Sequence, residues 1–317
     1  MRYVFAPLEG VTDAIFREVH HRMFPGADRY YMPFFSPTSE HLFTPRELRQ
    51  LLPEHNRGLS VVPQILTKNA EDFLWAAHGL AEMGYTEVNL NLGCPSATVV
   101  AKGKGAGLLA CSDELDAMLD TIFSRTEIAV SVKTRIGVNE PSEWTTLLAI
   151  YDRYPLAELI VHPRTKREMY RSPVHMDAFD EALRGAAAPL CYNGELFTPE
   201  DVAAFAKAYP TVPAVMLGRG AAADPAFFRT LRGGAALTKE ELFAFHRELY
   251  AAYRAEYGVQ NAMRRMKEHW YYLACLLENG ETVRKKIART QDVGAFEYYV
   301  ADAFQTRTLR PVLHGRL

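Results

Sequence analysis

The sequence has no long hydrophobic run and contains little cysteine. Among its 317 residues no stretch approaches the ~20 consecutive apolar residues that cross a bilayer, and the N-terminus, MRYVFAPLEGVTD, lacks the apolar segment and cleavage pattern of a secretory signal. The four cysteines, at positions 94, 111, 191 and 275, form no CxxC pair. These absences argue against a membrane protein, a zinc site and a disulfide framework. We therefore predict a cytoplasmic protein with no metal and no membrane partner.

An excess of charge of one sign is also absent. The formal net charge is -2, which excludes a generally cationic nucleic-acid-binding protein. The charge is unevenly distributed, because residues 237–317 contain 13 Lys and Arg against 10 Asp and Glu, whereas the rest of the chain is acidic. This weak asymmetry permits a nucleic-acid contact in the last quarter of the chain but does not require one.

What the sequence does contain is a regular alternation of short apolar runs and amphipathic segments. The predicted strands are Tyr3–Ala6, Tyr30–Pro33, Val61–Leu66, Glu87–Leu92, Ile128–Thr134, Leu159–Val161, Leu190–Tyr192 and Ala214–Leu217. Predicted helices between them include Asn69–Met83, Ser112–Phe123, Ser142–Tyr151 and Thr198–Ala208, with Ser112 and Thr198 as N-caps. A doubly wound sheet also alternates in this way, but eight strands within about 230 residues favour a closed (β/α)8 TIM barrel.

The organisation changes after Gly233-Gly234. From Leu237 to Phe304 the sequence has almost no strand signal, no proline and several helical stripes of apolar residues. We therefore predict a barrel over residues 1–234 and a small all-helical domain over residues 235–317. Within the barrel, the long connection 34–60 is predicted to be an elaborated loop.

Polar residues recur where the predicted strands end, which is the edge at which TIM barrels carry their active sites. Taken singly, Gln64 could be a capping amide, Lys133 a surface side chain and His162 a buried structural imidazole. Their shared position makes a common site the better explanation. The residues at strand ends are Pro7, Leu8, Glu9, Gln64, Asn91, Cys94, Lys133, Arg135, His162, Arg164, Asn193, Gly194, Glu195, Gly218 and Arg219.

The types of residue at these ends indicate the ligand. The Asn-Gly and Gly-Arg-Gly sequences at the last two strands fit the phosphate site common in barrels. Gln64 and Asn91 can each donate and accept hydrogen bonds, which suits a planar heterocycle, and Lys133 supplies a cation for charge on that ring. Phosphate at one end and a polar ring over the barrel centre describe a site for flavin mononucleotide (FMN).

Two further features lie near this predicted site. Cys94 follows the strand Glu87–Leu92 on a Gly-Cys-Pro turn, where the choice lies between a catalytic thiol and a buried cysteine that only packs. The segment Gly103–Gly107 does not fit GxGxxG, and we predict that it forms a flexible loop that carries Lys102 and Lys104 towards an anionic ligand.

With these motifs in place, the sequence resembles the tRNA-dihydrouridine synthase family along nearly its full length. The matching segments are APLEGVTD from Ala6, QIL from Gln64, NLGCPS from Asn91, KGKGAGLL from Lys102, VKTRIG from Val132, HPRTKREMY from His162, YNGE from Tyr192 and LGRG from Leu217. Two positions depart from the family pattern: Leu8 stands where many members have Met, and Pro163 where a small residue is common.

The resemblance implies an FMN-binding barrel and a helical tRNA-binding domain, with NADPH reducing the flavin, hydride passing to C6 of a uridine, and Cys94 protonating C5. It implies FMN contacts from Pro7, Leu8, Glu9, Gln64, Asn91, Lys133, His162, Asn193, Gly194, Glu195, Gly218 and Arg219. Candidate contacts to tRNA are Arg135, Arg164, Tyr170, Lys102, Lys104, Arg264, Arg265, Lys267, Arg284, Lys285, Lys286 and Arg289.

Three alternatives remain open from the sequence. One is a flavin reductase of free pyrimidines, against which the basic helical region argues. Another is a barrel aldolase or isomerase that uses Lys133 as a Schiff base, and the third is a flavin-free RNA-binding protein. The sequence does not indicate which uridine is reduced, nor the oligomeric state.

Overall fold

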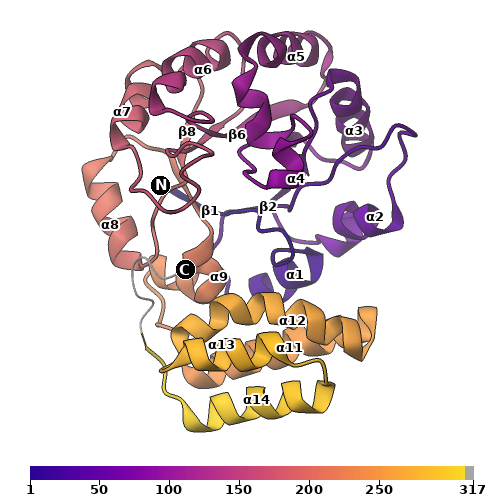
Figure 1. Ribbon diagram of the computed structural model, residues 1–317, viewed down its shortest axis with the longest axis vertical. Coiled ribbons are helices and arrows are strands. Elements are labelled where there is room, and N and C mark those ends of the chain that lie inside the picture. The colour runs from indigo at the N-terminus through magenta and orange to yellow at the C-terminus, as the bar shows by residue number, and fades with distance from the viewer. Residues whose placement is uncertain (311–317) are drawn as a thin grey trace.

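The structure, a computed structural model, describes residues 1–310 of the chain; the last seven residues of the predicted helical domain lie outside this part. Its centre is a barrel of parallel strands (Figure 1). The strands are β1 (Arg2–Phe5), β2 (Arg29–Tyr31), β3 (Val61–Val62), β4 (Gln64–Ile65), β5 (Glu87–Leu92), β6 (Ala129–Arg135), β7 (Leu159–His162), β8 (Leu190–Tyr192) and β9 (Ala214–Leu217). The predicted (β/α)8 barrel is confirmed.

One predicted strand is divided. The sequence predicts a single strand over Val61–Leu66, but β3 and β4 are separated by Pro63, which has no backbone N–H to give to a neighbouring strand. The hydrogen-bonded order is β3-β2-β1-β9-β8-β7-β6-β5-β4, so the two halves of the divided strand stand at the two ends of the order. Because the chain passes directly from one half to the other, the sheet closes into a barrel at this proline.

The helices surround the barrel and follow it in the sequence. Around the barrel and its loops lie α1 (Ala14–Met23), α2 (Pro45–Leu51), α3 (Ala70–Glu82), α4 (Ala97–Val100), α5 (Ser112–Arg125), α6 (Trp144–Tyr151), α7 (Met176–Gly185), α8 (Pro199–Ala208), α9 (Arg219–Ala223) and α10 (Phe227–Leu231). The helical region contains α11 (Lys239–Tyr257), α12 (Val259–Leu273), α13 (Gly280–Arg289) and α14 (Val293–Thr306). Within residues 1–310, every helix is too short or too polar to span a lipid bilayer.

Of the two predicted helix N-caps, one is confirmed and one is wrong. Thr198 caps α8 in a capping box with Asp201, as predicted. The prediction for Ser112 is wrong: Ser112 is the first residue of α5, and its N-cap is Cys111, with no side-chain cap. The connection 34–60, predicted to be irregular, contains α2, which begins with its own capping box at Thr44.

The apolar residues form an inner and an outer layer. The inner layer fills the barrel and consists of Val4, Ala6, Tyr31, Val62, Ile160, Cys191, Ala214 and Met216. Since side chains on a strand point alternately to its two faces, their neighbours in the sequence, such as Leu217 and Val161, pack outward against the helices. Cys191 is fully buried in the inner layer and packs there as a small apolar residue.

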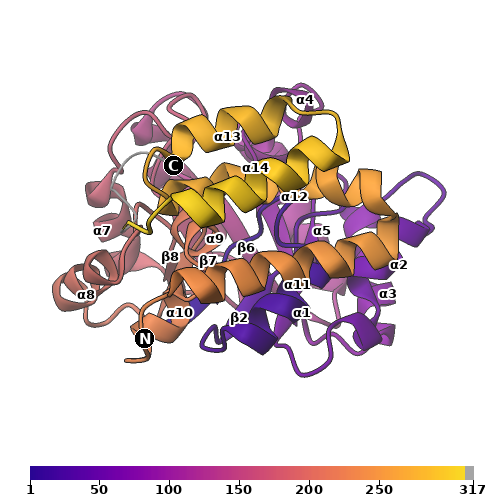
Figure 2. The same ribbon diagram turned by 90° about the horizontal axis from the view of Figure 1, so that it is seen from below.

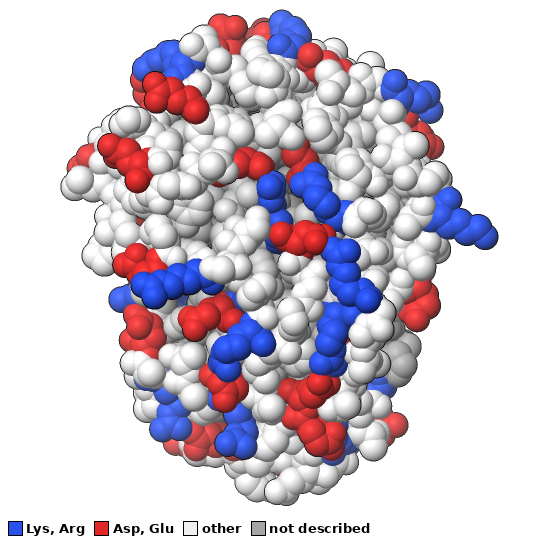
Figure 3. Space-filling model, turned by 180° about the vertical axis from the view of Figure 1, so that it is seen from behind, with Lys and Arg blue, Asp and Glu red and all other residues white. Residues whose placement is uncertain are grey.

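Charged residues close the barrel at the end where the strands begin. The carboxylate of Glu158 is only 2% exposed, and it accepts hydrogen bonds from Arg2 (2.6 Å) and from the Tyr31 hydroxyl (3.0 Å). Glu87 and Arg29 form a second ion pair there, at 2.7 Å. Figure 3, the view from behind Figure 1, shows acidic and basic side chains interleaved over that side of the molecule. That side therefore presents no extended field of positive charge.

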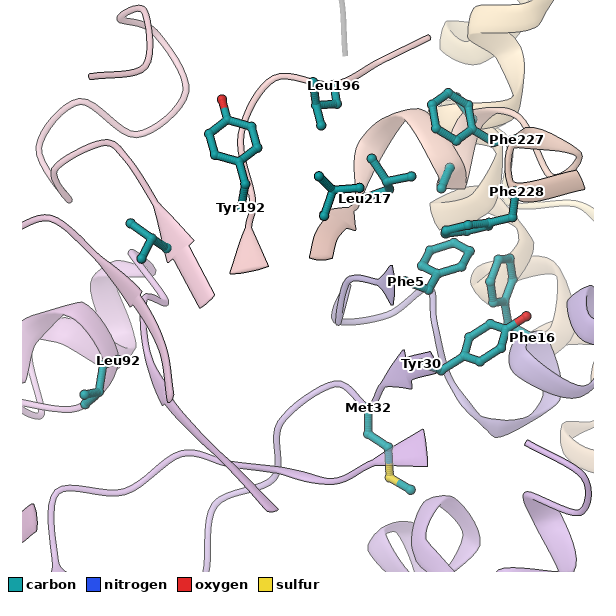
Figure 4. Packing of buried hydrophobic residues seen from close by; sticks show 14 of the residues in the cluster. Phe5, Phe16, Tyr30, Met32, Leu92, Tyr192, Leu196, Leu217, Phe227 and Phe228 are labelled. Atoms are coloured by element: carbon teal, nitrogen blue, oxygen red, sulfur yellow. The ribbon is translucent and has the colours of Figure 1, made fainter. Parts of the chain in front are cut away.

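The helical region packs against α1 and α9 of the barrel, with α11 on α1 and α12 on α9. Figure 1 shows α11, α12, α13 and α14 below the barrel, and Figure 2, seen from below, shows them in front of it. Aromatic rings fill the contact: Phe16 of α1 meets Phe245 edge-on at 6.0 Å and stacks on His269 at 5.4 Å, while Phe5 and Phe228 pack behind it (Figure 4). The predicted boundary at residue 234 falls between α10 and α11, and the division into two domains stays a prediction.

Candidate active site

The loop that carries Cys94 is held by the side chain of Asn91, the fifth residue of β5. The Asn91 Oδ1 atom accepts hydrogen bonds from the backbone N–H groups of Gly93 (3.0 Å) and Cys94 (2.9 Å). Its Nδ2 group donates to Oε1 of Gln64 at 2.7 Å. Asn91 therefore connects β4 to the loop and fixes the backbone at Cys94, which lies half-buried at the end of the barrel where the strands finish.

This hydrogen-bond chain continues down the inside of the barrel through two residues that the sequence analysis did not single out. Nε2 of Gln64 donates to Oδ1 of Asn89 (2.8 Å), and Nδ2 of Asn89 donates to the hydroxyl of Ser131 (2.9 Å). Asn89 and Ser131 are completely buried. In the sequence they stand out only as polar residues at inward-facing positions of buried strands. Polar side chains at such positions need hydrogen-bond partners, and this requirement could have indicated them.

The glycine-rich segment after α4 supports the Cys94 loop from behind. Gly105 has φ = +57°, and a Cβ atom there would lie 3.0 Å from the Cys94 carbonyl oxygen and 3.1 Å from the Cys94 Cβ. Ala106 donates its N–H to the same carbonyl oxygen at 3.1 Å. Residues Gly105–Ala110 form a largely buried 3-10 helix. The prediction of a flexible loop is therefore wrong, while Lys102 lies exposed and Lys104 half-buried at its edge.

Four cations gather around His162 at the end of β7. Burial lowers the pKa of His162 well below its ordinary range, and the charges of Arg135, Lys133, Arg164 and Arg219 lower it further, so the imidazole is neutral at physiological pH. Burial and the nearby Arg135 lower the pKa of Lys133 to about 8. Arg164 is paired with the carboxylate of Glu195 at 2.5 Å. Among residues 1–310 neither Lys133 nor Arg135 forms an ion pair, so this end of the barrel carries positive charge that an anion can neutralise.

Tyr170 covers part of this cationic cluster. Tyr170 is 49% exposed, and the guanidinium groups of Arg219 and Arg135 lie 4.6 Å and 5.3 Å from the centroid of its ring. The His162 ring stacks against the same ring, with the two centroids 5.8 Å apart. Such an arrangement offers an aromatic face beside several hydrogen-bond donors, which is suited to a planar ligand that carries negative charge.

Arg135 and Arg164 also donate hydrogen bonds to backbone carbonyl groups. Arg135 donates to the carbonyl oxygens of Gly93 (3.0 Å), Thr165 (2.9 Å) and Met169 (3.0 Å), so it ties the Cys94 loop to the loop after β7. Arg164 donates to the carbonyl oxygen of Ser172 at 2.6 Å. Both are 1% exposed. Their predicted contact with the substrate stays untested, and their positions show a role in shaping the site.

The ends of β1, β8 and β9 bring the remaining predicted residues together, since these three strands are neighbours in the barrel. Asn193 donates through Nδ2 to the carbonyl oxygen of Met216 at 2.8 Å. Gly218 precedes α9, and a Cβ atom there would lie 3.4 Å from the Cβ of Ala6. The same end of the barrel carries Pro7, Leu8, Gly194 and Arg219. Glu9 turns away from this group and pairs with Arg46 of α2 at 3.1 Å.

The thiol of Cys94 is suited to donating a proton. Burial raises its pKa above the ordinary range for cysteine, outweighing the effect of Arg135 and Lys133, which favour the thiolate. At neutral pH the group is therefore a protonated thiol. Within residues 1–310 no cluster of three or more His, Cys, Asp or Glu side chains is placed to hold a metal ion.

Of the predicted tRNA contacts on α12, two already interact with other groups of the protein and one is exposed. Arg265 pairs with the buried carboxylate of Asp13 at 2.9 Å and lies 4.1 Å from the centroid of the Tyr257 ring, so it joins the helical region to α1. Lys267 donates to the carbonyl oxygen of Thr290. Arg264 is exposed and makes one long hydrogen bond of 3.4 Å to Asn261.

On α13, Arg284 and Lys285 both pair with Glu281, and Arg284 also lies 4.8 Å from the centroid of the Tyr271 ring. Lys286 lies 5.6 Å from the centroid of Tyr299, and Arg289 is exposed. Two aromatic residues at the end of α12 differ in exposure: Trp270 is 1% exposed and packs between helices, whereas Tyr271 is 45% exposed.

Comparison with known proteins identifies the family of this chain. The sequence matches the family described as "Dihydrouridine synthase (Dus)" over residues 4–308. The tRNA-dihydrouridine(16) synthase of Ralstonia nicotianae is 31% identical over 240 residues, which cover 73% of each chain. The probable tRNA-dihydrouridine synthase 2 of Bacillus subtilis is 30% identical over 261 residues, covering 80% of this chain and 79% of the relative.

Solved structures show the same architecture. Morphinone reductase superposes with a TM-score of 0.53 at 14% identity, covering 74% of this chain and 86% of that one. A variant of NCR from Zymomonas mobilis gives a TM-score of 0.50, also at 14% identity, over 74% of this chain and 87% of that one. At such identities the likeness shows the barrel fold alone. The family match over nearly the whole chain carries the stronger conclusion: this protein is an oxidoreductase that belongs to the dihydrouridine synthase family.

Proposed function

We propose that this enzyme is a tRNA-dihydrouridine synthase that uses FMN and NADPH to reduce the C5–C6 double bond of a uridine in tRNA, with Cys94 as the proton donor. The tRNA substrate is proposed from the names of the two relatives. The cofactor and the role of Cys94 are proposed from the chemistry of the site.

The observation that carries the proposal is the group of cations around His162. Lys133 is half-buried, lacks an ion pair among residues 1–310 and has its pKa lowered to about 8, so an anion beside it would stabilise its charged form. FMN fits this charge, since it brings a phosphate and a ring that becomes anionic on reduction. The residues that would hold it are Pro7, Leu8, Gln64, Asn91, Lys133, His162, Asn193, Gly194, Glu195, Gly218 and Arg219. Glu9, also expected from the family resemblance, is left out because its carboxylate pairs with Arg46 away from this group.

Bound FMN supplies the hydride for C6 of the uracil, and NADPH restores that hydride. The chain supplies the proton: the S–H bond of Cys94 breaks, a C–H bond forms at C5, and the thiolate regains a proton from water. Asn91 keeps Cys94 in place by accepting both loop N–H groups. Arg135 and Lys133 lie near enough to favour the thiolate that remains after proton transfer.

A uridine stacked in RNA cannot enter the mouth of a barrel, so the base must be turned out of its stack. The proposed contacts for the RNA backbone are the cations that project from the surface. Lys102 and Lys104 flank the Cys94 loop, and Arg264, Lys286 and Arg289 lie on the helical region. On this proposal residues 1–234 form the catalytic domain and residues 235–317 the tRNA-binding domain. Arg135, Arg164 and Tyr170 would shape the mouth of the barrel for the substrate, and Arg265, Lys267, Arg284 and Lys285 would shape the RNA-binding surface of the helical region.

The test is substitution of Cys94. We expect Cys94→Ala to keep bound flavin and NADPH oxidation but to lose dihydrouridine formation by roughly 100-fold or more, the usual contribution of a positioned acid. Absorption spectra, NADPH oxidation and mass spectrometry of digested tRNA measure the three properties. Cys111→Ala is the matched control, because Cys111 is exposed at the start of α5. Normal turnover on tRNA by Cys94→Ala would remove the thiol from the mechanism.

A further inference from the structure

A pocket of about 480 Å³ lies between the end of β1, the connection that contains α2, and α12 of the helical region. Figure 1 shows α2 beside the barrel and above α12. Its lining includes Glu9, Met32, Phe35, Arg46, Gln50 and Arg265. Its volume is within the range of ligand sites, about 300–1,000 Å³. Cys94 is not among its lining residues, so the base that is reduced does not lie in this pocket.

The pocket nevertheless adjoins the reaction centre. The carboxylate of Glu9 contributes to the raised pKa of the Cys94 thiol. Burial raises the pKa of Glu9 itself, while the charges of Arg46 and Arg265 act in the opposite direction, so Glu9 interacts both with Cys94 and with the helical region. Glu9 therefore stands between the mouth of the barrel and the helical region. RNA that enters the mouth of the barrel and also contacts the helical region would pass over this pocket. A nucleotide next to the reacting uridine would then lie in it.

The pocket presents donors and acceptors that the protein leaves unused. Glu9 and Arg46 share one hydrogen bond of 3.1 Å, from Nη2 to Oε1, and their side chains are 51% and 78% exposed. Among residues 1–310, Oε2 of Glu9, the other N–H groups of Arg46 and Nε2 of Gln50 have no hydrogen-bond partner; Gln50 uses only its Oε1, which accepts from the N–H of Ala14 at 2.7 Å. Phe35, which is half-buried, provides apolar surface against which a planar ring can pack.

We propose that this pocket binds a guanine base of the RNA, next to the uridine that is reduced, and that Glu9 and Arg46 read its edge. Guanine is the base with two adjacent N–H donors, N1–H and N2–H, and a carboxylate accepts both at once. Its O6 atom accepts from a guanidinium group. Adenine and cytosine place an acceptor beside their amino group, and uracil has one N–H between two carbonyl groups, so each would face the Glu9 carboxylate with an acceptor. This inference rests on the proposed function.

The test combines a change in the protein with a change in the base. Arg46→Ala removes the donor to O6 from a side chain that is 78% exposed, so the fold is expected to be retained. Arg22→Ala is the matched control, because Arg22 also pairs with a glutamate, Glu248, at 3.0 Å but does not line the pocket. In transcripts of the substrate tRNA, each guanosine near the target uridine is replaced in turn by inosine, which lacks the N2 amino group.

We expect one inosine replacement to raise the KM of the unchanged enzyme for tRNA by roughly tenfold, the usual effect of losing one specific contact to a base edge. Arg46→Ala is expected to raise the same KM by a similar factor, with kcat and the KM for NADPH unchanged, whereas Arg22→Ala has no such effect. Unchanged KM values for every inosine transcript would overturn the inference, as would an effect of Arg46→Ala on the KM for NADPH, which would assign the pocket to the reductant. Failure of the unchanged enzyme to form dihydrouridine would instead refute the proposed function.

Discussion

The hydrogen bonds of Asn91 predict a measurable loss of stability when this side chain is shortened. Asn91→Ala removes two acceptor contacts and one donor contact, to Gly93, Cys94 and Gln64, at 2.7–3.0 Å. At about 1 kcal/mol for each bond, the free energy of unfolding should fall by about 3 kcal/mol.

Urea denaturation of the protein freed of cofactor measures this effect, because only the contacts of the chain then contribute. The slope with denaturant should stay constant, which shows that the same surface becomes exposed in each variant. Alkylation of Cys94 by iodoacetamide, followed by peptide mass spectrometry, reports the loosened loop independently. If the loss for Asn91→Ala is below about 0.5 kcal/mol, Asn91 does not hold the Cys94 loop in the way described.

Three further outcomes are expected. Because burial raises the pKa of Cys94, dihydrouridine formation should be level through neutral pH and fall only above the ordinary pKa of a thiol; a fall already between pH 6 and 7, with NADPH oxidation unaffected, would contradict this. The pKa of Lys133 is lowered to about 8, so its charge destabilises the cofactor-free fold below that pH. Lys133→Met should therefore stabilise this form at pH 7, and the gain in stability should shrink as the pH rises from 8 towards 10.5. Thermal unfolding of both proteins across this pH range checks the sign of the effect. Replacing Lys286 and Arg289 by Gln should lower the salt dependence of tRNA binding by about two counterions, whereas Arg284→Gln should change it less, since Arg284 is already paired with Glu281; equal slopes in all variants would place α13 away from the RNA.

The barrel could be predicted because buried parallel strands show themselves in the sequence as short apolar runs. All eight predicted runs form strands, and the one error, at Pro63, changes hydrogen bonding without changing the order of the strands. The ends of helices were less certain. A side chain that could cap, such as Ser112, was indistinguishable in the sequence from one that does, such as Thr198.

The partners of the charged and polar residues could not be predicted, because they lie far apart in the sequence. Arg265 meets Asp13 across 252 positions, and Arg135 meets carbonyl groups on two separate loops. Asn89 and Ser131 join a chain of hydrogen bonds that only the closed barrel brings together. The family motifs indicate which residues lie at the mouth of the barrel. Only the structure separates those that are free to face a ligand from those that bind backbone carbonyl groups.

The packing of α11 and α12 on α1 has a consequence for how the protein is made. Phe16 is covered by Phe245 and His269, and Asp13 is bonded to Tyr253 and Arg265, so α1 finds its partners more than 200 residues later in the chain. During synthesis the ribosome exposes α1 long before these partners emerge. We therefore expect nascent chains that end near residue 234 to carry an uncovered aromatic surface and to depend on chaperones until α12 has left the ribosome.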